Sequence, residues 1–193
     1  MKIYLIRHGQ TTGDVEGRFG GDYDDELTRL GIDQANELVS KLQDKEIKAL
    51  YHSPKIRAVQ TVNIIRKGIK AEAIEIENLR ERNGYGVLTG LTVEEAKLKY
   101  PEELIKFKEL GYKYHILESE DNSDFVKRVS EVMEFVENVN ENIAIVTHGG
   151  VIRTFCRLLD LGEISKLSDC AIIEFEKNEE DLKVKSLDGV KFE

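Results

Sequence analysis

Short apolar runs alternate with longer amphipathic segments along most of the chain. Runs that are rich in β-branched residues are typical of buried strands, whereas apolar positions three and four residues apart are typical of helices. This pattern predicts strands at 2–7, 47–53, 72–79 and 142–150. It predicts helices at 27–47, 54–68, 92–111, 121–139 and 151–162, and a closing hairpin at 170–187.

The order of these segments predicts the fold class. Strands that alternate with helices form a mostly parallel sheet with helices on both faces. We therefore expect an α/β fold, a three-layer α/β/α sandwich, in a single domain over residues 1–193. The helical run and loop at 92–121 fall outside this alternation, and we interpret them as a helical elaboration that could act as a lid.

Several predicted helices carry sequence signals at their ends. Thr28 is a suitable N-cap for the first helix. Pro54 falls at the first turn of the second helix, and Gly68 falls at its end. Thr92 and Glu95 have the spacing of a capping box.

Composition and charge narrow the class of ligand. The chain has 193 residues, of which 40% are hydrophobic and 34% are charged, as in ordinary soluble proteins. Its formal net charge is −9 at pH 7. Nucleic acids and acidic membranes attract surfaces with excess lysine and arginine, so we expect neither as a partner. A bound phosphate would need a local pocket of opposite charge.

The cysteines and the N-terminus indicate a cytoplasmic protein. Cys156 and Cys170 are too few for a disulfide scaffold, and both lie in apolar surroundings where a free thiol fills the core. No Cys and His spacing suggests zinc. The apolar run after Lys2 is too short for a signal peptide, and no apolar run approaches the length of a membrane span.

Polar residues follow the predicted strands at the points where the strands end. In an open α/β sheet these carboxyl ends share one edge, and ligands bind beyond it next to helix N-termini. The residues at this edge are Arg7, His8, Gly9, Ser53, Arg57, Arg80, Glu81, Arg82, Thr147, His148, Gly149 and Gly150. So many arginines in one place predict a negatively charged ligand.

This combination of side chains suits phosphoryl transfer. Arginine forks match phosphate oxygens, and glycines let backbone N–H groups approach an anion closely. A neutral imidazole can attack phosphorus, and a carboxyl group can protonate the departing oxygen and later take a proton from water. Guanidinium and imidazolium groups can hold the phosphoryl charge, so we expect no metal and no cofactor.

Five motifs in order resemble those of one family. They are LIRHGQT, GRFGGDYDDELTRLGIDQA, YHSPKIRAVQT, LRERNGYGVLTGLT and VTHGGVIR, and together they span almost the whole chain. On these motifs the sequence resembles the histidine phosphatase superfamily, the phosphoglycerate mutase-like group with an Arg-His-Gly signature. The resemblance implies a phosphoglycerate mutase-like fold and a phosphohistidine intermediate.

The resemblance also implies roles for individual residues. His8 would attack phosphorus, and Glu81 would donate the proton to the leaving group. Arg7, Arg57 and His148 would bind the non-bridging oxygens. Further substrate-binding residues implied by the motifs are Gln10, Thr11, Asp14, Arg18, Gly20, Gly21, Arg82, Tyr85 and Gly149.

Some positions leave alternatives open. The acid-bearing segment also contains Glu77, which is an alternative to Glu81 as the proton donor. Asp14 stands where the family commonly has asparagine, and its charge would repel a phosphate unless it were paired. We expect Asp14 to pair with a nearby cation such as Arg18. The remaining histidines, His52 and His115, match no motif and are interpreted as structural or surface residues.

The superfamily contains phosphatases and mutases, and the chain favours hydrolysis. Longer mutases place adjacent arginines after the acid segment, whereas residues 92–124 contain none, and Gln10 stands where mutases typically have glutamate. We therefore predict a metal-independent phosphomonoester hydrolase that acts on a small phosphorylated metabolite. The alternatives are mutase-type phosphoryl transfer and a non-catalytic phospholigand-binding protein. Phosphorylated sugars, glycerates, ribazole phosphate and phosphoserine are all open as substrates, and the closing hairpin could offer an edge for a homodimer.

Overall fold

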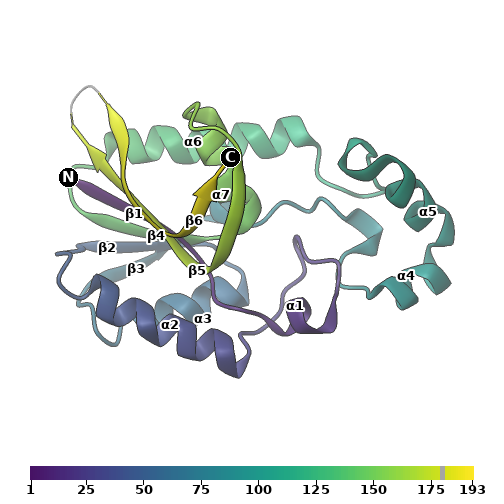
Figure 1. Ribbon diagram of the computed structural model, residues 1–193, viewed down its shortest axis with the longest axis horizontal. Helices are drawn as coiled ribbons and strands as arrows, with labels where there is room; N and C mark the ends of the chain where they lie inside the picture. The colour runs from purple at the N-terminus through teal and green to yellow at the C-terminus, as the bar shows by residue number, and fades with distance from the viewer. Residues whose placement is uncertain (179–180) are drawn as a thin grey trace.

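The computed structural model describes residues 1–178 and 181–193 and is built around one six-stranded sheet (Figure 1). The sheet has the strand order β3-β2-β4-β1-β5-β6. Its strands are β1 (Lys2–Arg7), β2 (Ala49–His52), β3 (Glu72–Glu75), β4 (Ile143–Thr147), β5 (Ile164–Lys177) and β6 (Leu182–Phe192). The first four strands in the spatial order are parallel, β5 runs antiparallel to β1, and β6 runs antiparallel to β5. The mostly parallel sheet is therefore confirmed.

Helices cover both faces of the sheet. The α-helices are α1 (Thr12–Glu16), α2 (Arg29–Leu42), α3 (Ile56–Ile65), α4 (Val93–Lys99), α5 (Pro101–Leu110), α6 (Asn122–Asn138) and α7 (Gly149–Leu158). Short 3-10 helices are η1 (Glu77–Leu79), η2 (Gly86–Leu88) and η3 (Gly111–Lys113). Helices α2 and α3 lie on one face and α6 and α7 on the other (Figure 1), as the predicted sandwich requires.

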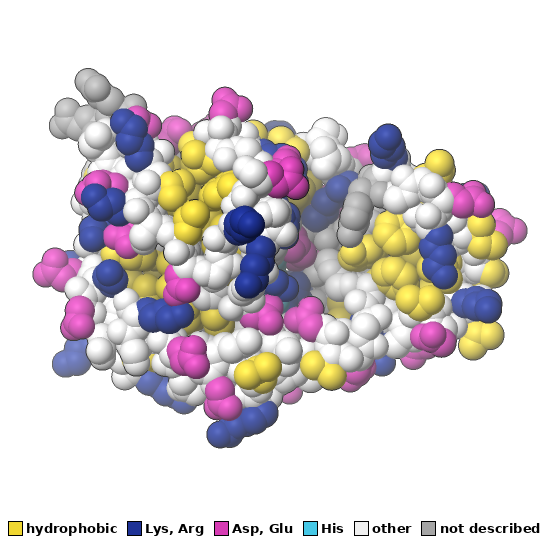
Figure 2. Space-filling model, in the orientation of Figure 1, with side chains coloured by type: hydrophobic (Ala, Val, Ile, Leu, Met, Phe, Trp, Pro, Cys, Tyr) yellow, Lys and Arg dark blue, Asp and Glu magenta, His cyan; other side chains and the backbone are white. Residues whose placement is uncertain are grey.

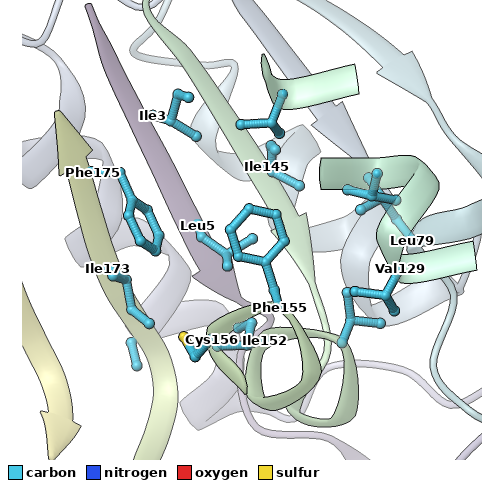
Figure 3. Close-up of a cluster of buried hydrophobic side chains, with 14 of the residues drawn as sticks. Ile3, Leu5, Leu79, Val129, Ile145, Ile152, Phe155, Cys156, Ile173 and Phe175 are labelled. Atoms are coloured by element: carbon cyan, nitrogen blue, oxygen red, sulfur yellow. The ribbon is translucent and has the colours of Figure 1, made fainter. Parts of the chain in front are cut away.

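The alternation of side chains along β1 divides the core between these two faces. Ile3 and Leu5 point to the side of α6 and α7, where they pack with Phe155 (Figure 3). Tyr4 and Ile6 point to the side of α2 and α3. Because successive strand residues face opposite sides, one continuous apolar strand fills two cores at once. This burial fixes where β1 ends and therefore where the residues that follow it lie.

The segment at 92–121 forms the expected elaboration, but not as one helix. Thr92 and Glu95 make the predicted capping box at the start of α4. Tyr100 then leaves the helical conformation before Pro101, because a proline disfavours helix in the residue before it, and α5 starts at that proline. A separate small cluster of buried side chains holds the elaboration together, namely Leu88, Ala96, Leu104 and Ile116.

The structure corrects several predicted boundaries. The strand predicted at 72–79 ends at Glu75, because β2 offers only four partners, and the chain turns into η1. Pro54 lies before α3, whose N-cap is Lys55. Thr28 is the N-cap of α2, as predicted. The closing hairpin has longer strands than predicted, and its residues 179–180 lie outside the described residues.

None of the described helices combines the length and the apolar character needed to cross a membrane.

Candidate active site

The two histidines predicted to share a site lie side by side. His8 follows β1 and His148 follows β4, and these strands are parallel neighbours in register. The centroids of the two imidazole rings are 5.1 Å apart. Both side chains are buried at the carboxyl edge of the sheet. The strand ends therefore bring together two histidines that are 140 positions apart in the sequence.

Arg57, from the first turn of α3, links the two rings. Its Nε donates to His8 Nε2 and to His148 Nδ1, both at 3.2 Å. Its Nη1 donates to Asp25 Oδ1 at 2.9 Å, and its Nη2 donates to the carbonyl of Gly21 at 2.8 Å. The guanidinium is thus held in one orientation by groups from three parts of the chain.

These contacts determine the tautomer of each ring. His8 Nδ1 lies 2.8 Å from the carbonyl of Gly9, which can only accept, so Nδ1 carries the proton. His8 Nε2 therefore carries a lone pair. His148 Nδ1 accepts from Arg57, so His148 Nε2 carries the proton and donates to Ser53 Oγ at 2.7 Å.

Both imidazoles are neutral at pH 7. Burial lowers the pKa of His8 well below its ordinary value, and the charges of Arg57 and Arg7 lower it further. Burial and the charge of Arg57 lower the pKa of His148 in the same way. A neutral imidazole with a free lone pair is the form that can act as a nucleophile.

A cavity of about 1050 Å³ opens beside His8. Its walls include six arginines, namely Arg7, Arg18, Arg57, Arg82, Arg153 and Arg157, against three acidic side chains, Asp14, Asp25 and Glu81. Figure 2 shows a hollow in the surface with Lys and Arg side chains at its rim. In a protein of net charge −9 this is a local concentration of positive charge that suits an anion.

Arg7 lines this cavity and has an unused donor. Its Nη1 donates to the carbonyl of Leu167 at 2.8 Å and lies 3.2 Å from Asp169 Oδ1. Its Nε is buried and, among the described residues, has no hydrogen-bond partner. A buried donor without a partner is costly, and an oxygen of a bound phosphate would satisfy it.

Glu81 also faces the cavity, and backbone donors hold its carboxylate. Oε1 accepts from the N–H of Arg82 and Oε2 accepts from the N–H of Gly150, both at 2.8 Å. By contrast, the side chain of Glu77 is 71% exposed and pairs with Arg80. Of the two candidate proton donors, Glu81 therefore lines the cavity and Glu77 does not.

The structure brings most of the other predicted site residues to the same cavity. Those that line it are Thr11, Asp14, Arg18, Gly20, Gly21, Arg82, Tyr85 and Gly149. Gln10 does not line it, because its side-chain oxygen accepts from Thr28 Oγ1 at 2.8 Å. His148 is fully buried behind Arg57. His52 is buried and His115 is exposed, consistent with structural and surface positions.

The predicted pair between Asp14 and Arg18 is wrong. Asp14 Oδ2 accepts from the backbone N–H and the hydroxyl of Thr11, at 3.0 and 2.9 Å, in a capping box at the start of α1. Arg18 pairs instead with Glu16 and Glu95, at 2.6 and 2.9 Å. The negative charge of Asp14 is thus stabilised by hydrogen bonds at a helix N-terminus.

Sequence reasoning missed several residues that hold the site in place. Asp25 forms a buried ion pair with Arg57, with side-chain exposures of 7% and 5%. Thr61 Oγ1 accepts from the N–H of Gly9 at 3.3 Å, and Asp169 pairs with Arg7. The run of acidic residues around Asp25 was visible in the sequence, but nothing in it indicates which carboxylate turns inward.

Comparison with known proteins assigns the family. Residues 3–188 match the sequence model of the histidine phosphatase superfamily (branch 1). The chain belongs to this superfamily. Its predicted family and fold are thereby confirmed, and relatives that are named as phosphoserine phosphatases are consistent with the predicted hydrolase class.

Members of the histidine phosphatase superfamily with different names resemble this chain to a similar degree. The metal-independent phosphoserine phosphatase of Arabidopsis thaliana is 30% identical, over 89% of this chain and 74% of the relative. A 2,3-bisphosphoglycerate-dependent phosphoglycerate mutase of Rhizobium etli is also 30% identical, over 82% and 79%. The solved structure of Bacillus stearothermophilus YhfR is 28% identical, with a TM-score of 0.83 over 97% of this chain and 96% of that chain.

Proposed function

We propose that the protein hydrolyses a small phosphomonoester whose leaving group carries a second negative group. The observation that carries this proposal is the neutral His8 imidazole, whose Nε2 lone pair lies in a cavity lined by arginines and by Glu81. A nucleophile, cationic donors for the phosphoryl oxygens and a carboxyl group for the leaving oxygen are all within one pocket.

In the first step, His8 Nε2 forms a bond to phosphorus while the phosphate ester bond breaks. In the free enzyme, the Nε–H of Arg57 donates to His8 Nε2. When the substrate binds, a phosphoryl oxygen accepts this N–H instead, and the lone pair of His8 Nε2 becomes free to attack. The unpaired Nε of Arg7 supplies a second donor. The Glu81 carboxyl gives its proton to the departing oxygen, which leaves as an alcohol.

In the second step, water replaces the alcohol at the site. The Glu81 carboxylate takes a proton from this water, whose oxygen attacks phosphorus as the bond to His8 breaks. Phosphate is released and His8 returns to its neutral form. The charge that develops on the phosphoryl oxygens in both steps is stabilised by guanidinium groups, and no step requires a metal.

The helical elaboration at 92–121 favours hydrolysis over mutase-type transfer. A mutase must protect its phosphohistidine from water and hold its intermediate with additional cations. Among the described residues, those of α4 and α5 do not line the cavity, so this segment contributes no arginine to it. The cavity opens at the surface as a hollow (Figure 2), so water can reach the site.

The outer part of the cavity supports a substrate with a second anionic group. Arg153 and Arg157 lie one helical turn apart on α7, and both line the cavity together with Arg82. Arg153 Nη1 donates to the carbonyl of Ile164 and Arg157 Nε pairs with Glu163 at 3.0 Å, which leaves other guanidinium N–H groups of both side chains for a carboxylate. Phosphoserine, the substrate named for the Arabidopsis relative, has such a carboxylate next to its phosphate ester. We propose an ester of this class.

A cytoplasmic location belongs to the same proposal, since both cysteines are free and buried, as in a reducing compartment. The pairing of two copies through β6 stays a prediction, which analytical ultracentrifugation tests.

The experiment compares wild type, His8→Ala and the matched control His115→Ala with O-phosphoserine and p-nitrophenyl phosphate in EDTA. We expect phosphate release by wild type and the control, and loss of at least about 10³-fold in His8→Ala. Trapping with radiolabelled substrate should give an acid-labile phosphohistidine only when His8 is present. Strict metal dependence, or full activity without His8, would contradict the proposal. Interconversion of 2- and 3-phosphoglycerate without phosphate release would favour the mutase alternative.

A further inference from the structure

The segment that carries Glu81 has no regular secondary structure of its own. Residues 81–83 lie between η1 and η2 and belong to neither helix nor strand. The Glu81 carboxylate is aimed by two backbone N–H groups, but those donors can only align it if the backbone around Glu81 is fixed. Something outside the segment must therefore hold it.

Arg128, on α6, makes the contacts that hold this segment. It is 7% exposed, and its guanidinium lies 4.6 Å from the centroid of the Phe125 ring. Nη1 donates to the carbonyls of Asn78 and Arg80 at 2.9 and 2.6 Å, and Nη2 donates to the carbonyl of Glu81 at 3.1 Å. One buried side chain thus holds the carbonyl groups of two residues before Glu81 and the carbonyl group of Glu81 itself.

Glu120 completes the arrangement from the loop before α6. Its Oε1 and Oε2 accept from Arg128 Nε and Nη2 at 2.7 and 2.9 Å, in a bidentate ion pair. Its Oε2 also accepts from the N–H of Asn83 at 3.2 Å, and its carbonyl accepts from Arg82 Nη2 at 3.1 Å. The ion pair therefore holds the chain on both sides of Glu81.

The ionisation of Glu120 is consistent with this arrangement. Burial opposes its charged form, but the hydrogen bond and charge of Arg128, together with the charge of Arg80, outweigh burial and lower the pKa of Glu120. The pair is thus ionised at neutral pH. Because it is bidentate and buried, it fixes direction as well as distance.

We propose that Arg128, through its ion pair with Glu120, is a positioning residue that holds the Glu81 carboxyl where it protonates the leaving oxygen. This inference rests on the proposed function. Neither residue lines the cavity, so neither contacts substrate and both act through Glu81.

A positioning role has a signature that a general structural role lacks. When the ester bond breaks, an alkoxide such as that of serine needs the proton from Glu81, whereas p-nitrophenolate leaves without one. The kinetic constant kcat/KM reports only the steps up to formation of the phosphohistidine, which makes it independent of the later use of Glu81 as a base. A misplaced acid therefore lowers kcat/KM for O-phosphoserine much more than for p-nitrophenyl phosphate.

The test measures kcat/KM for both esters in wild type, Arg128→Gln, Glu120→Gln and the control Arg29→Gln, whose side chain is 86% exposed. We expect Arg128→Gln to lose about 10²-fold with O-phosphoserine and less than about threefold with p-nitrophenyl phosphate, in line with general-acid contributions. Glu120→Gln keeps the shape of the side chain and removes its charge, and we expect the same result from it. It serves as the test if circular dichroism shows that Arg128→Gln does not fold. Arg29→Gln should match wild type with both esters.

A double-mutant cycle separates this inference from the proposed function. Glu81→Gln should show the same selective loss, and Arg128→Gln should add almost nothing to it, because the two act as one unit. Equal losses with both esters, no loss with either, or additive losses would overturn the positioning role. Failure of wild type to form phosphohistidine on His8 would instead overturn the proposed function.

Discussion

Replacement of Gly150 by alanine tests the placement of the proton donor most directly. A Cβ at this position would lie 2.2 Å from Glu81 Oε1 and 3.0 Å from Glu81 Cδ. Ordinary contacts between such atoms need about 3.5 Å, so the carboxyl must move by roughly 1 Å. The atoms it meets are the end of a flexible side chain, and alanine favours helix over glycine by about 1 kcal/mol. We therefore expect the fold to be kept while the carboxyl is displaced.

A displacement of this size costs about 10²-fold in rate, or about 2.7 kcal/mol of transition-state stabilisation. We expect Gly150→Ala to lower kcat/KM for O-phosphoserine by that factor with an unchanged or slightly higher Tm. Ser40→Ala, on the exposed side of α2, is the control for a small change in a helix and should behave as wild type. Wild-type kcat/KM in Gly150→Ala would refute the geometry, and a large fall in Tm would show that the backbone, not the carboxyl, gives way.

Three further changes test other parts of the site. Asp25→Asn leaves the buried charge of Arg57 uncompensated, so the free energy of unfolding measured in urea should fall by about 3 kcal/mol. An unchanged midpoint of the urea transition would mean that the ion pair contributes little to stability. Because the pKa values of His8 and His148 are lowered on folding, the unfolded chain binds more protons below about pH 6.5. As the pH decreases below that point, the free energy of unfolding should therefore decrease by about 1.4 kcal/mol per pH unit for each imidazole. His8→Asn should make this dependence on pH less steep. Arg157→Gln should raise the KM for O-phosphoserine about fivefold and leave the KM for p-nitrophenyl phosphate unchanged. An equal rise in the KM of both esters would argue against a carboxylate subsite.

The sequence alone was sufficient to predict the sandwich and the catalytic edge. Continuous apolar strands such as β1 can be recognised without tertiary information, because burial on both faces leaves no polar position in them. The ends of such strands then place His8 and His148 together, since parallel neighbours end at the same edge. The motifs gave Glu81 and Arg57 in addition.

The errors concern features that depend on partners distant in sequence. The strand at 72–79 was cut short because β2 provides only four pairing residues, which its own apolar pattern does not reveal. Asp14 lines the cavity as expected but bonds to Thr11 and not to Arg18, and Gln10 bonds to Thr28 and does not line the cavity. The inward turn of Asp25 depends on the position of Arg57, which only the folded chain defines.

The small cluster of Leu88, Ala96, Leu104 and Ile116 is physically separate from the two cores that hold the sheet. Mutations that reshape α4 and α5 therefore leave the sheet and its catalytic edge intact, while Tyr85, which packs on this cluster and lines the cavity, transmits their effect. The substrate specificity of such a protein can therefore change in evolution while its catalytic residues stay in place.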